Sequence, residues 1–210
     1  MFDAVIFDLD GTLVDTESLA HAAGMAAFAA LGAPVDEAFL HGMVGKDNPT
    51  ANRLIRARFP DLDMVALDQL WSAGYDARAG GGLPLRPGAA ELLGRITLPK
   101  ALCTSSHRAS AAHKLAVTGL AHHFAHVVVL EDVTRPKPAP EPYLLTAERL
   151  GVAPARCLVF EDSDTGTEAA RAAGMVVVQV PDVGHVGGQH ASYLARDLLA
   201  GARAAGLRLA

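Results

Sequence analysis

Short apolar runs alternate with segments of helical pattern over most of the chain. The runs 4–8, 100–104, 126–130, 156–160 and 175–180 have the length and apolar content of buried strands. Helical patterns lie between the later runs, over 107–118, 140–150 and 165–173, and a glycine follows each of them. Glycine often ends a helix because it adopts the left-handed conformation without a steric penalty. The alternation predicts an α/β fold with a doubly wound parallel sheet.

Residues 16–83 depart from this alternation. Helical patterns cover 18–31, 36–41, 50–58 and 63–79, and none of the apolar runs between them predicts a strand. The segment ends in three consecutive glycines and Pro84, a flexible stretch with a rigid end. We therefore expect an α-helical domain, residues 16–83, inserted into an α/β domain made of residues 1–15 and 84–210. The glycines suit a hinge, and a plain surface loop is the alternative.

Composition narrows the functional classes. Half of the 210 residues are hydrophobic, which is enough for a well-packed core. The formal charge of −5 and the absence of a Lys/Arg run argue against a nucleic-acid partner. Cys103 and Cys157 lie inside apolar runs, where buried thiols are expected rather than a disulfide framework or a zinc site.

No apolar run approaches the ~20 residues that a membrane span needs. The N-terminus opens on a strand, without the basic and apolar pattern of a leader peptide. A soluble, cytoplasmic protein with no membrane partner is therefore the expectation.

The first apolar run leads directly into two carboxylates, Asp8 and Asp10, followed by Gly11 and Thr12. Side chains two residues apart in an extended chain point the same way, so both carboxylates are expected on one side of the carboxyl end of a strand. Open α/β sheets hold their ligands at that end. Such a pair suits a divalent cation, or a nucleophile with its acid/base, whereas a surface turn is the alternative.

Polar residues also follow the second and third runs. Thr104 and Ser105 offer hydroxyl and amide groups to a phosphate oxygen, and Ser106 is expected to cap the helix that follows. Lys137 stands between two prolines, which stiffen the backbone around a cation held in one place. A solvated lysine in a loop is the alternative reading.

A second acidic pair, Glu161 and Asp162, ends the fourth run. Alone, the pair is compatible with a helix cap. Because the carboxyl ends of parallel strands meet at one edge, two acidic strand ends favour a metal site.

These motifs, in this order, resemble those of the haloacid dehalogenase superfamily, in the branch with a helical cap inserted after the first strand. Asp8-Leu9-Asp10-Gly11-Thr12 is similar to its first motif, Thr104 to the second, Lys137 to the third and Glu161-Asp162 to the fourth. The branch includes proteins like β-phosphoglucomutase, phosphoglycolate phosphatase and pseudouridine monophosphatase. The resemblance covers essentially the whole chain and implies a Rossmann-like catalytic core with a helical cap domain.

The resemblance also implies a Mg²⁺-dependent phosphatase that acts on a small phosphomonoester, either a sugar phosphate or a nucleotide-like compound. Asp8 would attack the phosphorus and form an aspartyl-phosphate intermediate. Asp10 would protonate the leaving alkoxide and then activate the hydrolytic water. Lys137 would neutralise charge on the nucleophile and the phosphoryl group, and Thr104 would orient a phosphoryl oxygen.

The resemblance implies metal and substrate contacts as well. Asp8, the Asp10 backbone carbonyl and Asp162 would hold Mg²⁺, with Glu161 nearby or acting through water. Gly11 and Ser105 are the expected substrate contacts in the core. Lys46, in the cap segment 41–48, is expected to contact the leaving group, with a solvated lysine as the alternative.

Two positions depart from the family pattern. Pro136 stands before Lys137 where the motif commonly has glycine, which is expected to alter the approach of the lysine, and Glu141 replaces an aspartate. Mutases of this cap class usually carry a histidine where this chain has Ala20, and His21 is about 100° away on a helix. A phosphatase is therefore favoured, with a β-phosphoglucomutase-type sugar-phosphate mutase as the alternative.

Two classes without enzymatic turnover remain as further alternatives. A phosphoacceptor module of the response-regulator type carries its aspartate after the third strand and needs no helical insertion. A catalytically silent binding protein is the other, because fold does not dictate function. The expected partner is a small phosphorylated metabolite, and the expected assembly is a monomer or a weak dimer.

Overall fold

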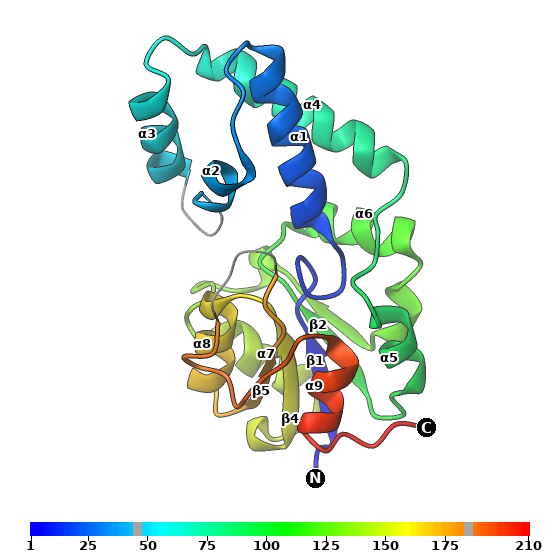
Figure 1. Ribbon diagram of the computed structural model, residues 1–210. Coiled ribbons are helices and arrows are strands. Elements are labelled where there is room, and N and C mark those ends of the chain that lie inside the picture. Colours follow the sequence, from blue (N-terminus) through cyan, green and yellow to red (C-terminus); the bar gives the residue numbers. More distant parts are fainter. Residues whose placement is uncertain (44–47, 183–186) are drawn as a thin grey trace. The chain divides into compact units, whose positions relative to one another are not determined.

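The computed structural model describes residues 1–43, 48–182 and 187–210 (Figure 1). Lys46, the expected cap contact, lies outside the described residues. The chain divides into two compact units. The first consists of Met1–Asp15 and Pro84–Ala210, and the second is Thr16–Leu83. No helix in the described parts of the chain is long and apolar enough to cross a membrane.

The first unit is built on a parallel sheet with the strand order β3-β2-β1-β4-β5-β6. Its strands are β1 (Ala4–Phe7), β2 (Lys100–Cys103), β3 (His126–Val128), β4 (Cys157–Glu161), β5 (Val176–Gln179) and β6 (Tyr193–Leu194). The predicted doubly wound parallel sheet is confirmed, and the edge strand β6 is an addition that the sequence pattern did not indicate. β1 is central and wholly buried, as its continuous apolar run requires.

Helices cover both faces of this sheet: α5 (Ala89–Arg95), α6 (Arg108–Thr118), α7 (Glu141–Leu150), α8 (Asp164–Ala172) and α9 (Leu198–Ala204). α7 packs on β2 and β3 and α8 on β4 and β5, while α5 and α9 contact each other over the other face (Figure 1). Short 3-10 turns complete the unit at Ala121–His123, Leu130–Asp132 and Pro154–Arg156. The core includes the stacked rings of Phe7 and Phe160, with centroids 5.0 Å apart, and both cysteines are buried free thiols, as predicted.

The helix ends follow the glycine signals. Gly119 and Gly151 end α6 and α7 in the left-handed conformation, with φ of 68° and 67°. The start of α6 differs from the prediction, because the Ser106 hydroxyl does not cap it. That hydroxyl donates to a carboxylate of the sheet edge instead, and the Arg108 N–H at the start of α6 donates to Glu131 Oε2 at 2.9 Å. A hydrogen bond to a charged oxygen is stronger than a cap to a backbone amide, which accounts for the difference.

The second unit is helical in its described residues: α1 (Thr16–Ala30), α2 (Glu37–His41), α3 (Asn48–Arg58) and α4 (Met64–Gly80). α1 and α4 pack along each other. The unit has its own core around Phe28, whose ring lies 6.1 Å from that of Phe39, 5.9 Å from that of Phe59 and 6.0 Å from that of Trp71. These edge-to-face and tilted contacts are favourable for aromatic rings at such distances.

The segments by which the chain leaves and re-enters the first unit are paired with each other. The Asp15 N–H donates to the Pro84 carbonyl at 2.9 Å, and the Arg86 N–H donates to the Leu13 carbonyl at 2.9 Å. Val14 and Leu85 form an antiparallel bridge between them. We call 13–15 and 84–86 the paired stem.

Candidate active site

The carboxyl edge of the sheet carries a groove of about 310 Å³. Its lining is Asp8, Asp10, Thr104, Ser105, Ser106, Lys137, Asp162, Ser163 and Thr165. The strand register explains the gathering, because Phe7 pairs with both Leu102 of β2 and Phe160 of β4. The residues that follow these three strands therefore emerge at the same level, which is where ligands bind in such sheets.

Lys137 reaches from the loop after β3 to the end of β1. Its Nζ donates to Asp8 Oδ1 at 2.7 Å, to Glu161 Oε1 at 2.6 Å and to the Cys103 carbonyl at 3.0 Å. Burial alone would lower the pKa of Lys137, but the carboxylates of Asp8 and Glu161 raise it well above its ordinary value. The lysine is thus a fixed cation beside Asp8.

The proline before Lys137 does not keep the lysine from Asp8. Glu141, which stands where the family motif has aspartate, accepts hydrogen bonds from the N–H groups of Thr134 at 2.7 Å and Arg135 at 3.1 Å. The longer carboxylate therefore anchors the loop that carries the lysine, which gives this departure from the pattern a structural role.

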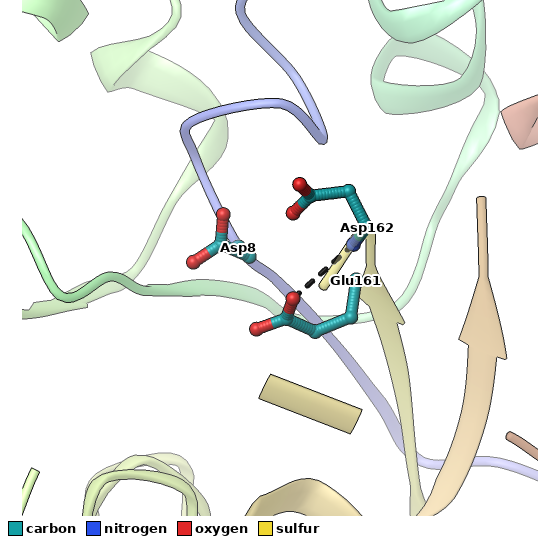
Figure 2. Close-up of side chains that lie close together, drawn as sticks. All are labelled: Asp8, Glu161 and Asp162. Carbon is teal, nitrogen blue, oxygen red and sulfur yellow. Dashed lines mark hydrogen bonds between the residues drawn. The ribbon is translucent and has the colours of Figure 1, made fainter. Parts of the chain in front are cut away.

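Glu161 accepts hydrogen bonds from several neighbouring groups at this edge of the sheet. Besides Lys137, its carboxylate accepts from the Tyr143 hydroxyl at 2.7 Å and the Ser163 hydroxyl at 3.1 Å. The Asp162 N–H also donates to it at 3.1 Å (Figure 2), and the Ser163 N–H donates to it at 3.3 Å. With both oxygens engaged, Glu161 is suited to holding Lys137 in place.

Asp162 is held from two sides. The Thr12 hydroxyl donates to its Oδ1 at 3.1 Å, and the Gln179 amide donates to its backbone carbonyl at 3.0 Å. Gly11 adopts a φ of 81°, and a Cβ at this position would overlap the Asp162 carboxylate. Glycine is therefore required here both for the backbone conformation and for the close approach of the acid.

The carboxylates of Asp8, Glu161 and Asp162 form one cluster, in which each offers an oxygen within 4.8 Å of the others (Figure 2). Burial raises the pKa of Asp8 to about 7; Lys137 opposes this rise, and Glu161 and Asp10 add to it. Burial and the charges of Glu161 and Asp8 also raise the pKa of Asp162 well above its ordinary value. This excess of buried negative charge is what a hard divalent cation offsets, so the donor set fits Mg²⁺.

The Asp10 side chain has different partners from those of this acidic cluster. Its Oδ2 accepts from the Ser106 hydroxyl at 2.6 Å, and its Oδ1 accepts from Lys114 Nζ at 2.5 Å. The Ser106 N–H donates to Thr104 Oγ1 at 3.0 Å, which fixes the turn after β2. The loop of Asp10 is thereby tied to the loop of Thr104.

Most of the residues predicted for the site meet in this groove, and Glu161 lies against it. Gly11 is the exception among the described ones, since its N–H donates to the Val14 carbonyl at 2.8 Å within the first loop. Sequence reasoning missed Tyr143, Thr12 and Lys114. Lys114 comes from the middle of α6 and Tyr143 from the first turn of α7, where no local signal marks them. Thr12 was part of the first motif without an assigned role.

The chain matches the haloacid dehalogenase-like hydrolase family over residues 2–174. The chain belongs to this family. The resemblance predicted from the four motifs is therefore confirmed, and with it the expectation that the protein is a hydrolase.

Relatives of this haloacid dehalogenase-like hydrolase include the fructose-1-phosphate phosphatase YqaB of Escherichia coli, which is 38% identical over an alignment 187 residues long that covers 85% of this chain and 96% of that protein. A putative β-phosphoglucomutase from Thermotoga maritima superposes with a TM-score of 0.78 at 30% identity, covering 92% of this chain and 94% of its own. A family hydrolase from Deinococcus radiodurans, solved with bound phosphate and sodium, gives a TM-score of 0.84 at 28% identity, covering 97% and 94%.

Proposed function

We propose that the protein is a Mg²⁺-dependent phosphatase that hydrolyses a small sugar phosphate through an aspartyl-phosphate intermediate on Asp8. The hydrolase family and the phosphatase name of a relative support a phosphoric monoester hydrolase. The observation that carries the finer proposal is Asp8 in direct contact with Lys137, at 2.7 Å, in a groove that also holds hydroxyl groups and two further acidic residues, Asp10 and Asp162.

Asp8 is placed to act as the nucleophile. It stands at the end of the central strand, where the chain gives way to a loop, and its N–H is fixed on the Phe160 carbonyl at 3.0 Å. Lys137 stabilises the charged carboxylate, and its ammonium group would also meet the charge of an incoming phosphoryl oxygen. Thr104, Ser105 and Ser106 line the same groove and would orient that group.

Asp8 and Asp162 would hold Mg²⁺, together with the Asp10 backbone carbonyl. When bound, the cation would neutralise charge on the phosphoryl oxygens and reduce the repulsion between two anions. Glu161 would support the site by holding Lys137 and the loop of Asp162 rather than by facing the cation directly.

Asp10 would exchange protons with the reacting oxygens. In the first step the Asp8 oxygen bonds to phosphorus, the bond from phosphorus to the ester oxygen breaks, and Asp10 gives its proton to the leaving alkoxide. In the second step Asp10 takes a proton from water, the water oxygen bonds to phosphorus, and the bond from phosphorus to the Asp8 oxygen breaks, which releases inorganic phosphate. Asp8 is then restored.

The sugar-phosphate class rests on the relatives. YqaB, which is 38% identical to this chain, is named a fructose-1-phosphate phosphatase. The mutase alternative is not favoured, even though a putative β-phosphoglucomutase shares the fold. The position at which such mutases usually carry a histidine is Ala20 in this chain.

A panel of phosphomonoesters with Mg²⁺ tests the proposal. We expect phosphate release from fructose 1-phosphate and other hexose phosphates, and a fall of about 1,000-fold or more in Asp8→Asn. Glu148→Gln, a charge removed from an exposed position of α7, is the matched control and should retain full activity. Conversion of glucose 1-phosphate to glucose 6-phosphate without phosphate release would reject the phosphatase reading, and no reaction with any ester would reject both.

A further inference from the structure

Lys114 of α6 closes a three-residue cluster around Asp10. Its Nζ lies 2.5 Å from Asp10 Oδ1 and 3.0 Å from Ser106 Oγ, and the Ser106 hydroxyl donates to Asp10 Oδ2 at 2.6 Å. Each oxygen of the Asp10 carboxylate therefore has its own donor. Two donors on different oxygens fix the plane of a carboxylate as well as its position.

The burial of these groups shows that the contact is not a casual surface pair. The Lys114 side chain is 12% exposed and that of Asp10 is 30% exposed. An ammonium group this far from water is costly unless it is paired. Surface ion pairs between two mobile side chains contribute little, but here Ser106, on the loop that leads into α6, contacts both partners and restricts them.

The two lysines of this region serve different acids. Lys137 bridges Asp8 and Glu161, at 2.7 and 2.6 Å. Lys114 contacts Asp10 from the helix that follows β2. Asp10, which lines the groove, is thus paired with a cation from α6, a different lysine from the one that contacts Asp8.

We propose that Lys114 is a positioning residue that, together with Ser106, holds the Asp10 carboxylate in one orientation for proton transfer to the leaving group. This inference rests on the proposed function, in which Asp10 acts on the ester oxygen. Proton transfer requires the donor within hydrogen-bond reach of its target, so a carboxylate that samples several orientations is a poorer acid and base.

The leaving group provides a test that separates positioning from general damage. p-Nitrophenolate leaves without help from an acid, whereas the alkoxide of a sugar must be protonated as the bond breaks. The value of kcat/KM reports steps up to the formation of the phosphoenzyme. In Lys114→Met we expect kcat/KM for fructose 1-phosphate to fall about 30-fold and that for p-nitrophenyl phosphate to stay within about threefold.

Two further variants sharpen the comparison. Lys114→Arg keeps a cation that reaches a carboxylate and should recover a large part of the lost activity toward fructose 1-phosphate. Arg108→Met removes a cation from the same helix whose partner is Asp132, at 2.6 Å, and should leave both esters unaffected. An equal loss for the two esters, or a change in KM alone, would contradict the positioning role and point to structural damage or to substrate contact.

Crystal structures of the wild type and Lys114→Met test the same proposal without turnover. We expect the Asp10 carboxylate to lose its single orientation in the variant. If Asp10 keeps that orientation, the inference fails whatever the enzyme hydrolyses. If neither ester is hydrolysed by the wild type, the proposed function fails, while the structures still decide whether Lys114 holds Asp10.

Discussion

Glu161 and Asp162 are neighbours in the chain with different partners. Glu161 engages Lys137, Tyr143 and backbone N–H groups, whereas the Asp162 side chain meets the Thr12 hydroxyl beside Gly11. Successive side chains at the end of β4 point to opposite sides of the sheet, so the two carboxylates face different ways. Glu161 therefore contacts the ammonium group of Lys137, and Asp162 faces the groove.

Variants of Glu161 and of its hydrogen-bond partner Tyr143 distinguish the effect of the charge of Glu161 from the effect of one hydrogen bond to it. Glu161→Gln removes one of the two carboxylates that contact Lys137. We expect kcat to fall by about 100-fold, because the lysine loses its fixed position. Tyr143→Phe removes only one hydrogen bond to Glu161 and should lower the free energy of unfolding by about 1 kcal/mol with a much smaller change in kcat. Steady-state kinetics and urea denaturation of both variants check this, and equal losses of kcat would contradict it.

Gly11 offers a test of the close approach to Asp162. In Gly11→Ala the new Cβ meets the Asp162 carboxylate, so we expect a higher Mg²⁺ concentration for half-maximal activity. Gly119→Ala is the matched control, because Gly119 has a similar φ of 68° and nothing within 4 Å of an added Cβ. It should lose stability through backbone strain and keep the Mg²⁺ dependence of the wild type. A shared shift in both variants would show that strain alone is responsible.

At the scale of helices and strands, the sequence predicted what local patterns determine. β1, β2, β4 and β5 are buried apolar runs, and the ends of α6 and α7 carry glycine, so these elements were found. β6 spans only two residues, and α5 and α9 span seven each, which leaves too few apolar positions to reveal a period. The third run also proved shorter than predicted, since β3 ends at Val128 and a 3-10 turn begins at Leu130.

The site was predictable to the extent that it is built from strand ends. Asp8, Thr104 and Asp162 follow buried strands, and the parallel sheet brings such positions to one edge. Lys114 and Tyr143 reach the same edge from helices α6 and α7, and their contacts depend on how these helices pack on the sheet. Ser106 was assigned to a cap because the competing carboxylate is remote in the sequence.

The pair Arg86–Asp182 fastens the paired stem to the segment after β5. Arg86 Nη1 lies 2.6 Å from Asp182 Oδ1, and the Asp182 side chain is only 1% exposed. Arg86→Met leaves a buried carboxylate without this cation, so we expect a loss of about 3 kcal/mol in the free energy of unfolding, measured by urea denaturation. Arg156→Met, which breaks an exposed pair with Asp3, is the control and should cost much less. Equal costs would show that the buried pair contributes no more than a surface one.

At the scale of the whole molecule, the acidic cluster links stability to pH and to Mg²⁺. Burial raises the pKa of Asp8 to about 7 and that of Asp162 above its ordinary value, so without a divalent cation the folded protein binds protons more tightly than the unfolded chain. Its stability should therefore increase as the pH falls from about 8 to about 6 and decrease as the pH rises through about 7. Carboxyls whose pKa is lowered in the folded protein, such as Asp132 and Asp197, titrate at more acidic pH than this range. At those lower pH values they make the stability fall as the pH falls.

Melting temperatures in EDTA at about pH 8 and about pH 6 measure this dependence. With Mg²⁺ we expect a higher melting temperature at about pH 8 and a smaller difference between the two pH values, because the cation favours the charged carboxylates. Asp162→Asn should reduce both the pH dependence and the gain from Mg²⁺. A Mg²⁺ gain that is unchanged in this variant would place the cation elsewhere.

The paired stem also makes residues 16–83 a separable module. Hydrogen bonds between 13–15 and 84–86 hold the two ends of this segment side by side. The chain could therefore pass from one end to the other without the helices between them, and the strands of the sheet would keep their order. A short turn in place of residues 16–83 would convert the stem into an ordinary hairpin. The same architecture lets one α/β scaffold accept helical inserts of different length and surface, because the exchange alters a hairpin loop rather than the order of the strands.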